Sequence, residues 1–292
     1  MNSKLAIIYK LIIGGLTLVA VSVLFVYLSF LLPGKFNTAD WIRIGLTEHV
    51  IESIEKIENA EYKSPVDYPE QQNSTLTFAD LEPYLTKIRP GTVFVISHGK
   101  VVCNIIPGKW THVGFYIGTQ KQLGHLFGEE SSVYQNFRNY YSTGEEHLII
   151  DSSYKNGCAV RDFKEIAQLK SRSTLHSVLC LEPKLSVNQL SKILQTTLAE
   201  TGKKYDLNFS VADTSTLYCA ELIYNSFKYS GIEIKKRSSV LFRKILLPND
   251  IATELVAKQM DKYFEYKMCL IKNKNKVQDM ACIKEPGLIA GL

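Results

Sequence analysis

Two short motifs, far apart in the chain, constrain its fold most, because their side chains have a shared chemical use only if the fold brings them together. The first, Trp110-Thr111-His112-Val113-Gly114, opens an alternating apolar segment that is typical of a strand. The second, Tyr218-Cys219-Ala220-Glu221-Leu222, opens a segment with helical spacing. A helix start favours a thiolate, because unpaired N–H groups and the helix dipole stabilise negative charge there. We therefore predict a cysteine nucleophile, Cys219, with His112 on a neighbouring strand as its base.

These motifs belong to a longer ordered series: Pro-Gly-Thr-Val at 90–93, Trp-Thr-His-Val-Gly-Phe-Tyr-Ile-Gly at 110–118, Leu-Ile-Ile-Asp at 148–151, Gly-Lys-Lys-Tyr-Asp at 202–206, Tyr-Cys-Ala-Glu-Leu at 218–222 and Leu-Pro-Asn-Asp at 247–250. The series resembles the circularly permuted NlpC-type cysteine peptidases, the YiiX/YaeF-like papain-fold amidases, over roughly residues 77–252. Non-permuted relatives place the cysteine before the histidine. Lecithin:retinol acyltransferase-like enzymes share the permuted order, so the resemblance implies a papain-like fold and thiol acyl chemistry more firmly than a substrate.

A catalytic imidazole needs an acceptor for its second nitrogen, and three acidic residues compete for that role. Asp151 ends an apolar strand, and the resemblance places a polar third member at this strand. Asp206 lies in a predicted loop, where capping a turn is the simpler role. Glu221 lies two residues after Cys219, on nearly the opposite side of a helix, and we interpret it as structural or as a first-turn helix charge. We therefore predict that Asp151 orients His112.

Tyr205 is the predicted substrate-binding residue. The resemblance implies that its hydroxyl lines the cleft near the developing oxyanion, where the backbone N–H of Cys219 supplies another donor. The remaining histidines form no metal-ligand pattern, and no Cys-x-x-Cys motif occurs. We therefore expect neither a metal nor a cofactor.

Composition limits the class of protein. The chain has 292 residues, of which 46% are apolar and 22% charged, so it can bury one sizeable core. The formal net charge of +5 is mild, and the basic residues are scattered without interleaved aromatic residues. A nucleic-acid partner is therefore not expected. Besides Cys219 there are five cysteines, an odd number that cannot all pair.

An uncharged stretch of 22 residues runs from Leu11 to Leu32. As a helix it is about 33 Å long, enough to cross a bilayer core of about 30 Å. The residues before Pro33 offer no convincing signal-peptide cleavage site, so we predict a tail and transmembrane anchor over residues 1–36. Basic residues flank both ends of the stretch, Lys4 and Lys10 on one side and Lys35 and Arg43 on the other. The positive-inside rule therefore supports the two membrane orientations almost equally. The short amino tail favours a single pass through the cytoplasmic (inner) membrane, with the catalytic domain periplasmic or extracellular.

The rest of the chain divides into three predicted regions. Residues 37–75 comprise a juxtamembrane amphipathic helix and a linker. Three roles for this helix stay open: it packs on the catalytic domain, lies on the membrane or pairs with a second copy. Its apolar positions are Trp41, Ile44, Ile51, Ile54 and Ile57. Residues 76–265 form the catalytic domain, an α+β permuted papain-like fold with helices flanking an antiparallel sheet. Residues 266–292 form a tail without an interpretable motif.

The catalytic domain carries an insertion at about residues 119–146, where a short hairpin would suffice. It is rich in aromatic residues: Tyr134, Phe137, Tyr140 and Tyr141. Two interpretations stay open, a lid or substrate wall and a surface elaboration that packs its own aromatic residues.

The predicted function is a membrane-anchored thiol hydrolase that cleaves an amide, a cell-wall-derived peptide by resemblance, through an acyl-enzyme on Cys219. One alternative is a lipid acyltransferase or thioesterase of the same fold. Another is a non-catalytic cell-envelope binding module, against which the intact Cys, His and Asp argue. The expected partners are thus a peptide or lipid acyl substrate and the membrane; the oligomeric state stays open.

Overall fold

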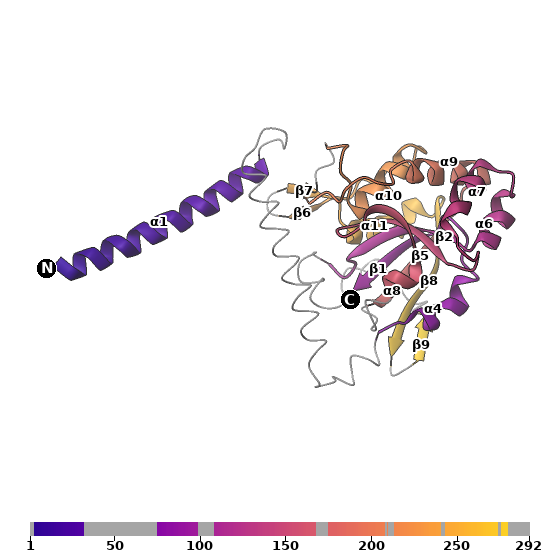
Figure 1. Ribbon diagram of the computed structural model, residues 1–292, viewed down its shortest axis with the longest axis horizontal. Helices are drawn as coiled ribbons and strands as arrows, with labels where there is room; N and C mark the ends of the chain where they lie inside the picture. The colour runs from indigo at the N-terminus through magenta and orange to yellow at the C-terminus, as the bar shows by residue number, and fades with distance from the viewer. Residues whose placement is uncertain are drawn as a thin grey trace. The chain divides into compact units, whose positions relative to one another are not determined.

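A computed structural model describes residues 3–31, 75–98, 108–167, 175–207, 209, 213–240, 243–273 and 276–279 (Figure 1). The chain divides into two units, Met1–Lys63 and Ser64–Leu292. The amphipathic helix and linker predicted over 37–75 lie outside the described residues, except for residue 75.

The described part of the first unit is one helix, α1, from Ser3 to Leu31. Its described large apolar side chains are exposed. Among the residues that the structure describes, no helix combines the length and the apolar character needed to cross a membrane. The transmembrane anchor over Leu11–Leu32 is therefore not confirmed and stays a prediction.

The second unit is built on an antiparallel sheet of seven strands, in the order β4-β3-β2-β1-β5-β8-β9. These strands are β1 (Val93–His98), β2 (His112–Gly118), β3 (Leu148–Ser153), β4 (Gly157–Asp162), β5 (Leu175–Pro183), β8 (Phe264–Asn273) and β9 (Lys276–Asp279). A separate two-stranded ribbon consists of β6 (Ser238–Val240) and β7 (Arg243–Ile245). The predicted combination of helices with an antiparallel sheet is confirmed.

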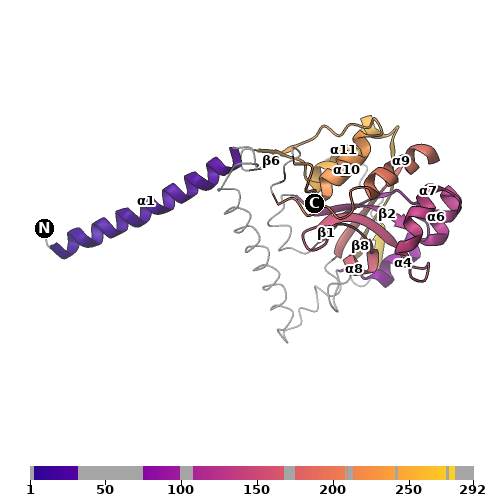
Figure 2. The same ribbon diagram turned by 45° about the horizontal axis from the view of Figure 1, so that its top comes forward.

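Helices lie on both faces of this sheet (Figure 2). In β1, Val93 and Val95 pack in one core cluster and Phe94 and Ile96 in the other, as the period of two in a strand requires. The first cluster includes residues of α9 (Val187–Leu198), α10 (Cys219–Lys228), α11 (Pro248–Leu255) and η2 (Lys258–Met260); the second includes residues of α4 (Phe78–Leu85) and α8 (Phe163–Ala167). The sheet therefore forms the middle layer, and α10, which begins at the predicted nucleophile, lies on one of its faces.

The insertion over 119–146 folds into α6 (Gln120–Phe127), α7 (Ser132–Phe137) and the 3-10 helix η1 (Arg138–Tyr140). Tyr134 and Phe137 are buried in the same cluster as α9 and α10, and the Tyr141 hydroxyl donates to the Gly118 carbonyl oxygen at 3.0 Å. The insertion follows the last residue of β2, whereas His112 is the first, so about 20 Å of strand separates them. The structure therefore favours an elaboration that packs its own aromatic residues over a lid at the predicted site.

Three strands, β4, β8 and β9, differ from the sequence analysis. Its pattern does not predict β4, because Cys158-Ala159-Val160-Arg161-Asp162 alternates too weakly between apolar and polar residues. Strand β8 pairs with β5 and continues past residue 265 to Asn273, and β9 pairs with β8. The sheet therefore includes residues that the sequence analysis assigns to the 266–292 tail.

The start of β4 contacts the segment that leads into α10. Gly157 has a φ of 63°, and a Cβ there would lie 2.3 Å from the backbone oxygen of Lys203. The next carbonyl, that of Lys204, accepts the N–H of Leu217 at 2.9 Å, just before α10 begins. Glycine at 157 thus permits the close backbone approach that connects β4 with the start of α10.

We expect Gly157→Ala to destabilise the fold far more than Gly202→Ala. Both glycines have positive φ, 63° and 87°, but a Cβ at Gly202 meets nothing within 4 Å. Gly202→Ala should therefore lower the free energy of unfolding only through backbone strain, by about 1 kcal/mol. Gly157→Ala adds a clash with the backbone, which should lower it by about 2 kcal/mol more, the middle of the range for overpacking. Urea denaturation of both variants measures the difference; equal losses would contradict the close approach.

Candidate active site

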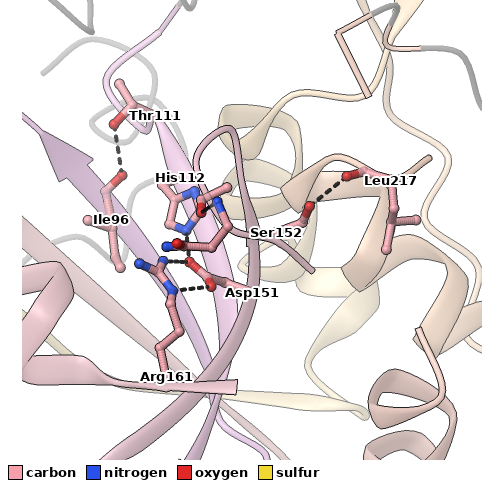
Figure 3. Close-up of polar contacts among 9 residues, drawn as sticks. Ile96, Thr111, His112, Asp151, Ser152, Arg161 and Leu217 are labelled. Atoms are coloured by element: carbon pink, nitrogen blue, oxygen red, sulfur yellow. Dashed lines mark hydrogen bonds and ion pairs between the residues drawn. The ribbon is translucent and has the colours of Figure 1, made fainter. Parts of the chain in front are cut away.

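His112 and Asp151 come from adjacent strands and form a hydrogen bond. The Nε2 atom of His112, the first residue of β2, lies 2.5 Å from Oδ2 of Asp151 on β3 (Figure 3). The Asp151 side chain is fully buried, and that of His112 is 12% exposed. Because Nε2 is engaged with Asp151, Nδ1 is the nitrogen left to face a thiol.

The register of the sheet makes this contact possible. Asp151 pairs with Gly114, two residues after His112 on the same strand. A Cβ on Gly114 would lie 2.9 Å from the Ile150 carbonyl oxygen and 3.0 Å from the Asp151 Cβ, closer than ordinary packing allows. The space beside Gly114 is therefore occupied by the Asp151 side chain, which reaches diagonally to His112.

Cys219 is the first residue of α10, and its thiol is free and only 3% exposed. Tyr218, the N-cap residue, makes no side-chain capping bond, so the N–H groups of the first turn are not capped by that side chain. Burial lowers the pKa of His112, but hydrogen bonds with Asp151 and Cys219, together with their negative charges, outweigh burial and raise this pKa to about 10. The imidazolium form is thus stabilised between a carboxylate and the sulfur.

Strand β3 also holds the segment before α10. The hydroxyl of Ser152, the residue after Asp151, donates to the carbonyl oxygen of Leu217 at 2.6 Å (Figure 3). Successive residues of a strand point to opposite faces, so Asp151 engages His112 while Ser152 engages the entry to the Cys219 helix. One strand therefore positions both partners of the thiol–imidazole pair.

Tyr205 lies close enough to Cys219 for their charges to interact. Burial, and then the negative charges of Cys219, Tyr218 and Asp206, raise the pKa of Tyr205 well above its usual value. Its hydroxyl therefore keeps its proton at neutral pH and is able to donate a hydrogen bond. The ring packs edge-on against Phe209, with 6.3 Å between ring centroids.

The two competing acids, Asp206 and Glu221, are both buried. Burial and the nearby charge of Asp206 raise the pKa of Glu221 to about 8, and its Oε2 atom has no hydrogen-bond partner among the described residues. Glu221 does lie in the first turn of α10, but a carboxyl that is largely neutral at pH 7 contributes little charge to the helix dipole interaction. A structural role is the part of the sequence-based interpretation that fits.

Arg161 is the site residue that the sequence analysis misses. From β4, its Nε donates to Oδ1 of Asp151 at 3.0 Å, and its Nη2 forms an ion pair with Oδ2 (Figure 3). The signal that points to Arg161 is the strand pairing of β4 with β3, which the sequence pattern does not predict.

A second histidine lies beside His112. The ring of His98, at the end of β1, has its centroid 6.1 Å from that of His112. Burial, and then the charges of His112 and His176, lower the pKa of His98 to about 3, so this imidazole stays neutral. Within the described ranges, no group of three or more His, Cys, Asp or Glu side chains is arranged to hold a metal ion.

Part of this chain is similar to known proteins. Residues 87–281 match the family described as permuted papain-like amidase enzymes, YaeF/YiiX, C92 family. A search of curated proteins gives no match. Among solved structures, the chain is similar to one described as metalloprotein yiiX from Escherichia coli O157:H7, with 14% identity, a TM-score of 0.40, and coverage of 56% of this chain and 92% of that one.

We expect Glu221→Gln to stabilise the protein increasingly as the pH rises. The folded-state pKa of Glu221, about 8, exceeds the ordinary value of 4.5. Raising the pH from 4.5 to 8 therefore ionises Glu221 in the unfolded chain first, and the wild-type unfolding free energy falls across this window. Glutamine does not titrate, so the variant should gain on the order of a few kcal/mol over wild type at pH 8 and much less at pH 5.

Urea denaturation at pH 5 and pH 8 measures this difference. The control is Glu130→Gln, at an exposed position, which should change the unfolding free energy by less than about 0.5 kcal/mol. An equal effect of Glu221→Gln at both pH values would show that Glu221 is not a buried acid with a raised pKa.

Proposed function

This chain belongs to the YaeF/YiiX, C92 family of permuted papain-like amidases, and from that premise we propose that Cys219 is the nucleophile of an amide hydrolase with His112 as its base. The observation that carries the proposal is the position of His112: its Nε2 lies 2.5 Å from Oδ2 of Asp151, and interactions with both Asp151 and Cys219 raise its pKa. Membership of an amidase family argues against the alternative of a non-catalytic binding module.

The first half-reaction forms a thioester. The Cys219 sulfur attacks the amide carbonyl carbon, and the C–N bond of the resulting tetrahedral intermediate breaks. The His112 imidazolium gives its proton to the leaving amine. The raised pKa of His112, about 10, supports this step because it keeps the imidazole protonated while the sulfur is a thiolate.

The second half-reaction releases the acyl group. Neutral His112 takes a proton from water, the resulting hydroxide attacks the thioester, and the carboxylic acid leaves as Cys219 is regenerated. Asp151 accepts from Nε2 of His112 throughout and so keeps Nδ1 directed at the thiol or the water.

Two donors are proposed for the oxyanion. One is the backbone N–H of Cys219, at the start of α10, and the other is the hydroxyl of Tyr205. The raised pKa of Tyr205 supports this role, because the hydroxyl stays protonated at the pH at which a thiolate attacks.

We propose a peptide amide, derived from the cell wall, as the substrate class. The family description supports an amide rather than an ester. Two of the four aromatic residues of the insertion, Tyr134 and Phe137, are buried in the core, so they do not form a wall for an acyl chain. Lipid acyltransferase or thioesterase activity is therefore an outcome of the test and not the favoured function.

The proposed location is the cytoplasmic membrane, with the hydrolase domain on its outer side. What supports a membrane anchor is the uncharged run from Leu11 to Leu32, the helical conformation of α1 and the exposure of its described apolar side chains. Exposing such a helix to water is unfavourable, because each buried apolar Å² contributes about 25 cal/mol.

The nucleophile assignment predicts selective labelling at pH 6. Iodoacetamide should modify Cys219 first, and Cys158, Cys180 and Cys269 should react much more slowly, because burial raises the pKa values of these three thiols. Peptide mapping by mass spectrometry identifies the modified residue. Labelling should abolish hydrolysis of wall-derived peptides.

The proposed role of Asp151 predicts a separate effect on turnover. Asp151→Asn should lower kcat on the order of a thousandfold with little change in KM.

The result that contradicts the assignment is preferential labelling of another cysteine, or full activity of Asp151→Asn. Phospholipids and acyl thioesters are assayed beside the peptides. If only lipids are turned over, and this turnover depends on Cys219, the protein is a lipid acyltransferase or thioesterase and not a peptide amidase.

The anchor proposal predicts that the full-length chain sediments with membranes and resists alkaline carbonate extraction. Deleting residues 1–36 should release the hydrolase domain into the supernatant. Protease added to spheroplasts should digest the domain while a cytoplasmic control protein survives. Extraction of the full-length chain by carbonate would exclude the anchor, and protection from protease would reverse the orientation.

A further inference from the structure

The buried carboxylate of Asp151 interacts with two basic side chains at once, those of His112 and Arg161. Its Oδ2 atom accepts from His112 Nε2 and is paired with Arg161 Nη2, while its Oδ1 accepts from Arg161 Nε at 3.0 Å. The Asp151 side chain is fully buried, and the guanidinium side chain is 15% exposed. Both oxygens are therefore used, and Arg161 holds the carboxylate as a fork that fixes its orientation.

Small neighbours on both sides of Asp151 create this arrangement. In the register of the sheet, Asp151 pairs with Gly114 on β2 and with Ala159 on β4. His112 lies two residues before Gly114, and Arg161 lies two residues after Ala159. Each side chain thus reaches Asp151 diagonally, over a small residue, from a different strand. The arrangement is built by the sheet and does not depend on a loop.

Charge compensation explains why a second cation is needed. Over the proposed reaction cycle, His112 alternates between imidazolium and neutral imidazole. Whenever His112 is neutral, a carboxylate paired with His112 alone would be an uncompensated buried anion, which is strongly unfavourable. Arg161 keeps its charge at every stage, because a guanidinium does not lose its proton in proteins.

We propose that Arg161 is a positioning residue that keeps Asp151 ionised and directed at His112 when His112 has given up its proton. The inference rests on the proposed function, because it concerns the state of His112 between the two half-reactions. Its consequence is specific: Arg161 matters most for deacylation, the step in which His112 must act as a neutral base.

Removing Arg161 should therefore affect the two half-reactions unequally. Without it, His112 becomes the only cation beside Asp151 among the described residues and holds its proton more tightly, so neutral imidazole forms only at higher pH. Among the described residues, the other titratable groups that interact with this pair are Cys219 on α10, His98 on β1, Cys158 on β4 and Tyr205 in the loop before α10. These side chains remain in an Arg161 variant. The charge of Arg161 also lowers the pKa of His98, but that pKa, about 3, lies far below the measured range, so a shift of the profile above neutral pH reports on His112 and Asp151.

The experiment uses the full-length chain and p-nitrophenyl acetate, an activated ester whose acylation burst and steady-state turnover are measured separately. Arg161→Met should keep a burst of about one nitrophenolate per enzyme, lower the steady-state rate at pH 7 on the order of tenfold, and move the steady-state pH profile to higher pH. Arg161→Lys should restore part of the rate and of the profile, because it returns the charge without the fork. Arg138→Met, which removes an exposed arginine of the insertion, is the control and should match wild type.

A double variant keeps the test valid if Arg161→Met does not fold. In an Asp151→Asn background there is no carboxylate to compensate, so adding Arg161→Met should change the rate less than twofold. Equal loss of burst and steady state in Arg161→Met, without a shift in pH profile and without rescue by lysine, would mean that Arg161 only supports the fold and would overturn the inference. Wild-type behaviour of Arg161→Met would also overturn it. Absence of a burst in wild type, with Cys219 unreactive to iodoacetamide, would instead refute the proposed function.

Discussion

The candidate site depends on one constraint, the burial of the Asp151 carboxylate. A carboxylate without solvent must be neutralised by protonation or compensated by cations and donors. Here burial raises the pKa of Asp151. The hydrogen bonds that Asp151 accepts from His112 and Arg161, together with their positive charges, outweigh burial and lower this pKa. The same compensation raises the pKa of His112, so the electrostatics of the base follow from the burial of its partner.

Strand β3 carries out the positioning. Successive side chains of β3 point to opposite faces, so Asp151 contacts His112 and Ser152 contacts the carbonyl of Leu217. The strand thus positions the base and the start of the Cys219 helix relative to each other. On its far side, β4 supplies Arg161 and, through Gly157, the close backbone approach to Lys203. Three antiparallel strands and the start of one helix thus form the site, and rigid elements hold chemical groups more accurately than loops.

Several features of the fold follow from local sequence patterns. The alternation in 112–118 and the helical spacing that begins at Cys219 are properties of nearby residues, and β2 and α10 lie where these patterns indicate. The aromatic residues of the insertion carry no comparable signal. Their burial beside α9 and α10 depends on partners distant in sequence, so composition alone left a lid and a packed elaboration equally open.

The sequence by itself determined the order of the motifs, with the histidine strand before the cysteine helix, and, together with the family resemblance, it predicted Asp151 as the acid beside His112. These are contained in local patterns and in their succession along the chain. Only the tertiary structure decided the rest. Arg161 lies in a strand with weak alternation and acquires its role through register with Asp151, and Glu221 becomes a largely neutral acid because it is buried beside Asp206. Register and burial are relations between distant segments, so no single stretch of sequence specifies them.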